Sequence, residues 1–142
     1  MKMDLKNLYR EIVNDHNLHP AHKYEMESPD VVLRGVNPAC GDDITLMLKV
    51  SGNIITEGSF TGSGCAISTA SVDMMLDDVI GLTADEARGL ILKFTDMIDG
   101  RISEDTELEV LNEAAYLKDI THMPARVKCA LLGWNTLKEI LG

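Results

Sequence analysis

Long apolar runs are missing from this sequence of 142 residues, and no stretch approaches the roughly 18 residues that a membrane-spanning helix needs. Basic residues are also few, because 13 Lys and Arg stand against 23 Asp and Glu, for a formal net charge of −10. This balance argues against a nucleic-acid-binding protein, since phosphate recognition needs clustered cations. The sequence also lacks a basic amphipathic helix of the kind that binds a membrane surface. We therefore expect neither nucleic acid nor membrane as a partner.

An apolar signal core is absent behind the first lysines of the chain, so we expect a cytoplasmic protein with reduced thiols. Cysteine is scarce as well, and the three cysteines cannot all pair with one another. In a reducing compartment they are core residues, reactive thiols or metal ligands. Hydrophobic residues make up 45% of the chain, which is typical of a globular protein. The length predicts a single domain over residues 1–142.

Alternation of apolar and polar residues predicts the strands. It is clearest over 44–50, and Ser51-Gly52-Asn53 then forms a hairpin turn to a return strand over 54–61. A shorter strand over 31–36 completes a three-stranded antiparallel meander. Apolar residues at three- and four-residue spacing predict helices at 4–16, 65–80, 84–98, 107–118 and 124–141. The remaining segments, 16–29 and 99–107, are predicted loops. Strands followed by helices indicate an α+β fold with several helices packed on one sheet face.

Each cysteine falls at or near the boundary of a predicted element. Cys40 lies in a Pro/Gly turn, and in extended backbone its side chain and that of Asp42 would point to the same side. Cys65 opens a helix, where the helix dipole favours a thiolate. Cys129 lies in the last predicted helix, next to two basic residues that precede it, Arg126 and Lys128. The spacings match no zinc-finger pattern, so from the residues alone buried core cysteines remain the alternative to a metal or thiol site.

Other potential ligands have simpler interpretations. Three histidines share the first predicted loop, where we expect solvated side chains rather than a metal site: His16, His19 and His22. His122 is expected in a loop or at the surface. The second predicted helix carries three acidic residues that indicate a solvated face rather than a carboxylate metal site: Asp73, Asp77 and Asp78.

Three segments nevertheless carry a specific resemblance, supported by the opening Leu8 to His16. They are Asn37-Pro38-Ala39-Cys40-Gly41-Asp42, Gly62-Ser63-Gly64-Cys65-Ala66-Ile67-Ser68 and Pro124-Ala125-Arg126-Val127-Lys128-Cys129-Ala130. In order and spacing, over nearly the whole chain, they resemble the SufU branch of the IscU/NifU-like iron–sulfur cluster assembly family. Lys128 stands where the scaffold branch usually has His, and the segment between Cys65 and Cys129 is longer than in that branch. Both features favour the SufU branch.

The resemblance implies a SufE/IscU-like fold and a metal site. The implied ligands are Cys40, Asp42, Cys65 and Cys129. Three thiolates and one carboxylate suit tetrahedral Zn²⁺. The same donors suit iron–sulfur ligation, so iron or a [2Fe–2S] cluster remains the alternative.

The function that the resemblance implies is a zinc-dependent sulfurtransferase. It would accept persulfide sulfur on Cys40 from a SufS-like cysteine desulfurase that uses pyridoxal phosphate, once a group of that partner displaces Cys40 from the metal. Arg126 would assist docking or stabilise the developing sulfur anion, unless it is a plain surface charge. The downstream partners would be other iron–sulfur assembly proteins. The alternatives are a scaffold for a [2Fe–2S] cluster and a structural zinc domain that activates the desulfurase.

Overall fold

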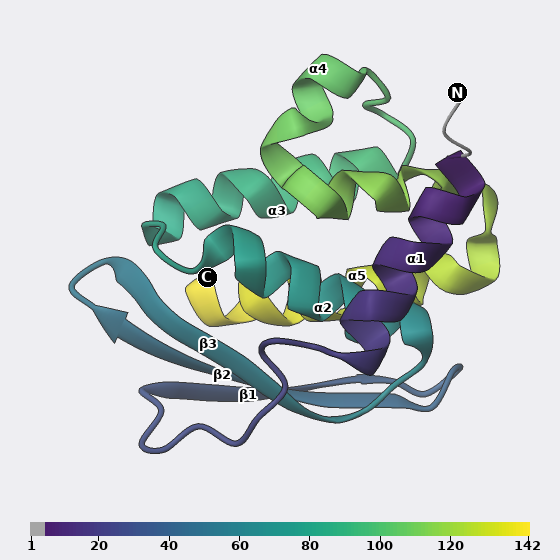
Figure 1. Cartoon of the computed structure of the whole chain (residues 1–142). Helices are drawn as coiled ribbons and strands as arrows, with labels where there is room; N and C mark the ends of the chain where they lie inside the picture. Colours follow the sequence, from purple (N-terminus) through teal and green to yellow (C-terminus); the bar gives the residue numbers. More distant parts are fainter. Residues whose placement is uncertain (1–4) are drawn as a thin grey trace.

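The chain folds as a three-stranded antiparallel sheet with helices on one face (Figure 1), and this computed structural model describes residues 5–142. The elements in order are α1 (Leu5–Leu18), β1 (Val31–Asn37), β2 (Asp42–Ser51), β3 (Ile54–Ser63), α2 (Ala66–Val79), α3 (Ala84–Ile98), α4 (Asp105–Leu108), the 3-10 helix η1 (Glu109–His122) and α5 (Pro124–Leu141). The predicted α+β meander with helices on one face is confirmed. No helix in this part of the chain is long and apolar enough to cross a membrane.

The sheet has the order β1-β2-β3, with both neighbouring pairs antiparallel. The face toward the helices buries apolar side chains of β2 and β3: Ile44, Leu46, Leu48 and Phe60. Helices α2 and α5 pack directly on that face, while α3 and η1 form an outer layer (Figure 1). The layers are joined by a stack of Phe94 on Trp134, with ring centroids 4.1 Å apart. This burial of large apolar side chains is the main force holding the helices on the sheet.

Helix boundaries follow local signals where these are strong. Thr83 and Glu86 form the predicted capping box at the start of α3, and Pro124 occupies the first turn of α5. Helix α1 extends to Leu18, two residues beyond its predicted end, and its predicted start at residue 4 lies outside the described residues.

The helix predicted over 107–118 is wrong in type. The structure has the short α4 followed by η1, with a break at Asn112, where φ is 52° and ψ is −129°. The buried side chains of η1 recur every third residue, at Leu111, Ala114, Leu117 and Ile120. A 3-10 helix has three residues per turn and aligns such a set on one face. The period of three in this apolar pattern was therefore the signal for η1. The predicted loop shortens accordingly to 99–104.

Two of the side chains predicted to be solvated are buried. His16 lies inside α1, not in the loop, and is only 7% exposed, while Asp73 of α2 is 1% exposed. The His16 Nδ1 lies 2.6 Å from Asp73 Oδ2. The pair is tolerated in the interior because each group satisfies the other as α1 crosses α2 (Figure 1). The remaining acidic pair, Asp77 and Asp78, is exposed and half-buried respectively.

Replacing Gly62 near the end of β3 should have a large effect on stability. Its φ is +111°, and a Cβ placed on it would overlap the backbone carbonyl oxygen of Asp43 on the neighbouring strand. Gly62→Ala should therefore lower the free energy of unfolding by about 3 kcal/mol, measured by urea denaturation. Gly89→Ala is the control, because a Cβ there meets open space within α3, and alanine should add up to about 1 kcal/mol. Equal stability of the Gly62 variant and the wild type would contradict the assignment.

Candidate metal centre

Cys40 lies in the tight turn between β1 and β2. The turn is closed by a hydrogen bond from the Cys40 backbone N–H to the Asn37 carbonyl oxygen at 3.2 Å. Gly41 follows with φ +71°, a left-handed conformation that glycine adopts without strain, so β2 begins at once with Asp42. The thiol of Cys40 is exposed at this end of the sheet.

Asp42 is buried and ties three elements together. Its Oδ1 accepts hydrogen bonds from the Cys65 backbone N–H at 2.8 Å and from the Ser68 hydroxyl at 3.1 Å. Its Oδ2 accepts a hydrogen bond from the Asn37 side-chain amide at 3.2 Å. These donors fix the carboxylate in position and compensate for its removal from water.

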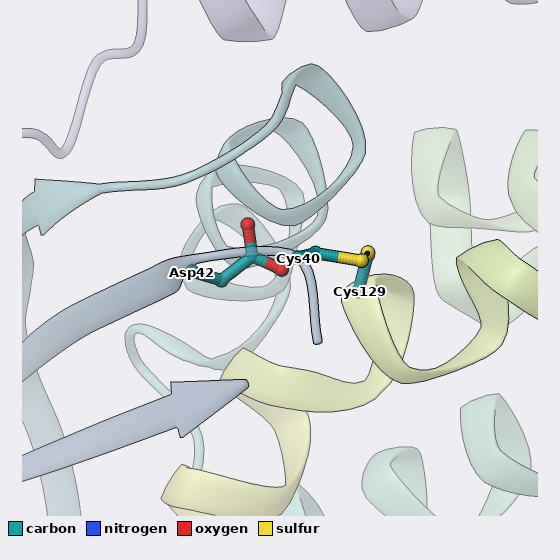
Figure 2. Close-up of side chains that lie close together, drawn as sticks. All are labelled: Cys40, Asp42 and Cys129. Atoms are coloured by element: carbon teal, nitrogen blue, oxygen red, sulfur yellow. Dashed lines mark hydrogen bonds between the residues drawn. The ribbon is translucent and has the colours of Figure 1, made fainter. Parts of the chain in front are cut away.

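Cys129 is buried in α5, and its sulfur reaches the turn that carries Cys40. The two Sγ atoms are 3.2 Å apart, although 89 positions separate them in the sequence. Figure 2 shows the two thiols side by side, with the carboxylate of Asp42 close to them. One ligand atom from each of Cys40, Asp42 and Cys129 lies within 4.8 Å of the others. Segments far apart in the chain therefore bring three of the four predicted ligands together.

Cys65 is adjacent to this group rather than inside it. It caps the N-terminus of α2, where its Sγ accepts a hydrogen bond from the Ser68 backbone N–H at 3.4 Å. Its own backbone N–H binds Asp42, as described above. A set of four ligands that includes Cys65 remains a prediction.

The electrostatics of the site favour a bound cation. Burial raises the pKa of the Cys129 thiol well above its usual range, and the neighbouring Cys40, Cys65 and Asp42 raise this pKa further. A thiol in this setting keeps its proton unless a positive charge replaces it. Two sulfurs and a carboxylate oxygen are donors that fit either zinc or an iron–sulfur cluster. The residues present therefore fit the metal centre that the motifs predict.

Arg126 lies in the first turn of α5 and is exposed. It lines a pocket of about 660 Å³ next to the thiols. The pocket also contains one of the predicted ligands, side chains from α1, α2 and η1, and the residue before α5: Tyr9, Arg10, Cys65, Ala66, Ile67, Asp119, His122 and Met123. Among the described residues, no carboxylate pairs with the Arg126 guanidinium. A cation is therefore available beside Cys65. His122 is exposed, as expected, and lines the same pocket.

Two supporting residues were not singled out by the sequence reasoning. Asn37 and Ser68 both donate to Asp42, and the Asn37 amide also lies 3.7 Å from the Cys129 sulfur. Both belong to the cysteine motifs, so their place beside the ligands was a usable signal. Such supporting hydrogen bonds orient metal ligands and are part of a site's design.

Comparison with known proteins agrees with this geometry. The family model described as "NifU-like N terminal domain" matches residues 8–130. The iron–sulfur cluster assembly scaffold protein IscU of Streptococcus pyogenes is 39% identical over 96% of this chain and 84% of the relative. The zinc-dependent sulfurtransferase SufU of Bacillus subtilis is 35% identical over 96% of this chain and 90% of the relative.

A solved structure shows the same fold. The crystal structure of a putative iron–sulfur cluster assembly scaffold protein for the SUF system from Fervidobacterium islandicum is 33% identical. It covers 93% of this chain and 95% of its own, with a TM-score of 0.87. The sequence and the fold of this chain are thus those of a class of iron–sulfur cluster assembly proteins. This chain belongs to the NifU-like N-terminal domain family, as its three motifs predicted.

Proposed function

We propose that this protein is a zinc-dependent sulfurtransferase that accepts persulfide sulfur from a cysteine desulfurase. The observation that carries the proposal is the exposed thiol of Cys40, whose sulfur lies 3.2 Å from that of buried Cys129 and next to buried Asp42. An accessible nucleophile inside a group of metal-binding atoms is what protected sulfur acceptance requires. The SufU relative, named a zinc-dependent sulfurtransferase, supports this choice.

The metal would be held by Cys40, Asp42, Cys65 and Cys129. Zinc bound there would keep the thiols deprotonated at neutral pH, because it supplies the positive charge that the buried site otherwise lacks. The hydrogen bonds from Asn37 and Ser68 keep the carboxylate of Asp42 in place during this exchange of proton for metal.

The transfer step uses the thiolate of Cys40. It attacks the outer sulfur of the persulfide on the partner's cysteine, and a new S–S bond forms as the partner's S–S bond breaks. The partner's cysteine leaves as a thiolate, and the product is a persulfide on Cys40, with no net oxidation. Arg126 is three residues before Cys129 on the same face of α5, so its guanidinium can stabilise sulfur anions or bind the approaching partner.

The setting of the reaction follows from the same proposal. The chain 1–142 acts as one cytoplasmic domain, its donor is a SufS-like enzyme with pyridoxal phosphate, and the sulfur passes on to downstream iron–sulfur assembly proteins. Reduced thiols in the cytoplasm are a requirement of this chemistry.

A [2Fe–2S] scaffold is the second candidate function. The same donor set suits iron–sulfur ligation, and the Streptococcus pyogenes relative bears the scaffold name. It requires a brown protein after anaerobic reconstitution and transfer of the cluster to an acceptor. The structural zinc domain, by contrast, requires that the protein activate the desulfurase even without the Cys40 thiol.

Elemental analysis separates the first two functions. Protein purified without oxygen and without added metal should contain about one zinc per chain, because the four predicted ligands match tetrahedral zinc. Cys65→Ala should lose most of this zinc, whereas Ser63→Ala, an exposed neighbour on β3, should retain it. Iron with an equal amount of acid-labile sulfide would instead make the scaffold the leading function.

A further inference from the structure

A second group of metal-binding side chains lies where α1, α2 and η1 meet. Each element supplies one residue, His16, Asp77 and Glu113, and one ligand atom from each lies within 4.8 Å of the others. Along α2, Asp77 lies twelve residues after Cys65, about 18 Å at the rise of an α-helix. This junction is therefore separate from the thiol centre.

His16 is held in the orientation of a metal ligand. Its Nδ1 faces Asp73 Oδ2 at 2.6 Å, and Asp73 is almost fully buried. The other oxygen of Asp73 accepts the backbone N–H of His22 at 3.0 Å, so the carboxylate is an acceptor on both sides. His16 therefore donates a proton from Nδ1 to Asp73, and its Nε2 is directed at the outer end of the junction. Metal-ligating histidines are typically fixed by a carboxylate in this way.

The outer end of the junction brings an imidazole nitrogen next to carboxylate oxygens. The Nε2 of His16 lies 2.9 Å from Glu113 Oε1, a separation at which either a proton on Nε2 or a shared cation joins the two groups. Close by on α2, the buried Oδ2 of Asp78 has no hydrogen-bond partner among the described residues. A positive charge at this junction, either a proton on His16 or a bound metal ion, would stabilise these groups.

A second imidazole is available to complete the set. His22 follows α1, and its Nε2 lies 2.7 Å from Asp77 Oδ1. The junction thus gathers two imidazoles and two carboxylates rather than acidic groups alone. Within the described residues, no Lys or Arg forms an ion pair with Asp73, Asp77 or Glu113. The groups that face these carboxylates are therefore the two imidazoles.

We propose that this junction is a second metal site, which binds a first-row divalent cation through His16, His22, Asp77 and Glu113. Imidazole and carboxylate donors without a thiolate favour ions such as Mn²⁺ or Fe²⁺, whereas the thiolates of the first centre favour softer metal ions. The bound ion fastens α1 and η1 to α2. It also secures the wall of the pocket beside Cys65, because Tyr9 of α1 lines that pocket.

Manganese is the probe that separates the two centres, since Mn²⁺ has little affinity for thiolates. Zinc-loaded protein is titrated with Mn²⁺, and loss of the electron paramagnetic resonance signal of free Mn²⁺ measures binding. We expect one saturable Mn²⁺ per chain in the wild type. Cys65→Ala should bind it equally well, which keeps this result independent of the sulfurtransferase proposal.

Glu113→Gln tests the ligands, and its affinity for Mn²⁺ should fall at least about 10-fold. Asp77→Asn is the second variant, and both side chains are about half exposed, so neither change should unfold the protein. Glu109→Gln, an exposed glutamate on the same segment, is the matched control and should bind as the wild type does.

Two results would contradict the proposal of a second metal site. If the charge at the junction is a proton on His16, the wild type shows no saturable Mn²⁺ binding, and nuclear magnetic resonance finds an imidazolium at neutral pH. Binding of equal strength in the wild type, Glu113→Gln and Asp77→Asn would likewise overturn the proposal.

Discussion

Cys40→Ala should abolish persulfide formation on this protein, a loss of at least about 100-fold relative to the wild type. Cys40 is the exposed thiol of the centre, whereas Cys65 is half-buried as a helix cap and Cys129 is fully buried in α5. A partner's persulfide can therefore reach Cys40 most directly. The turn that carries Cys40 is also the only one of the three settings outside a helix or a helix cap.

Intact mass spectrometry after incubation with a cysteine desulfurase and free cysteine measures this result. The wild type and the Ser63→Ala control should gain the mass of one sulfur atom, and Cys40→Ala should not. Peptide mapping then locates the sulfur. A persulfide found on Cys65 or Cys129 of the wild type, with Cys40 unmodified, would refute the assignment. Activation of the desulfurase by Cys40→Ala at the wild-type level would favour the structural zinc domain.

Asp42→Ala should weaken zinc binding at least about 10-fold and also destabilise the metal-free protein by about 2–4 kcal/mol. The second effect has a cause of its own. Loss of the carboxylate leaves three donors without their acceptor: the Asn37 amide, the Cys65 backbone N–H and the Ser68 hydroxyl. Because Asn37 and Ser68 are buried, water does not readily replace the lost partner.

Competition with a chromophoric chelator measures the zinc affinity, and urea denaturation of metal-free protein measures the stability. Asp43→Ala is the matched control, because the neighbouring carboxylate forms only an exposed ion pair with Arg34 at 2.6 Å. That variant should change neither quantity appreciably. Wild-type zinc affinity in Asp42→Ala would exclude Asp42 as a ligand.

The order of strands and helices could be predicted because its signals are local. The alternation over 44–50 and the turn after it specify the hairpin of β2 and β3, and the capping box at Thr83 specifies the start of α3. The same holds for half of the thiol centre. Cys40 and Asp42 come together through a turn of a few residues around Gly41, so the local sequence is sufficient to place them near each other.

The other half of the centre depends on packing over long distances. Cys129 meets Cys40 only because α5 lies across the sheet, and no local pattern encodes a contact between sulfurs 89 positions apart. The motifs indicated which residues belong to the site through family resemblance, but they did not indicate that Cys65 and Arg126 share a pocket.

Burial of charged groups was likewise decided by the tertiary structure. His16 and Asp73 are polar in the sequence and were predicted to be solvated, yet each is buried against the other where α1 crosses α2. Burial lowers the pKa of His16, but hydrogen bonds to Asp73 and Glu113 raise it above its ordinary value overall. Sequence periodicity alone determined which faces are apolar. Only the folded chain determined which polar groups find a partner inside, because that partner comes from a distant segment.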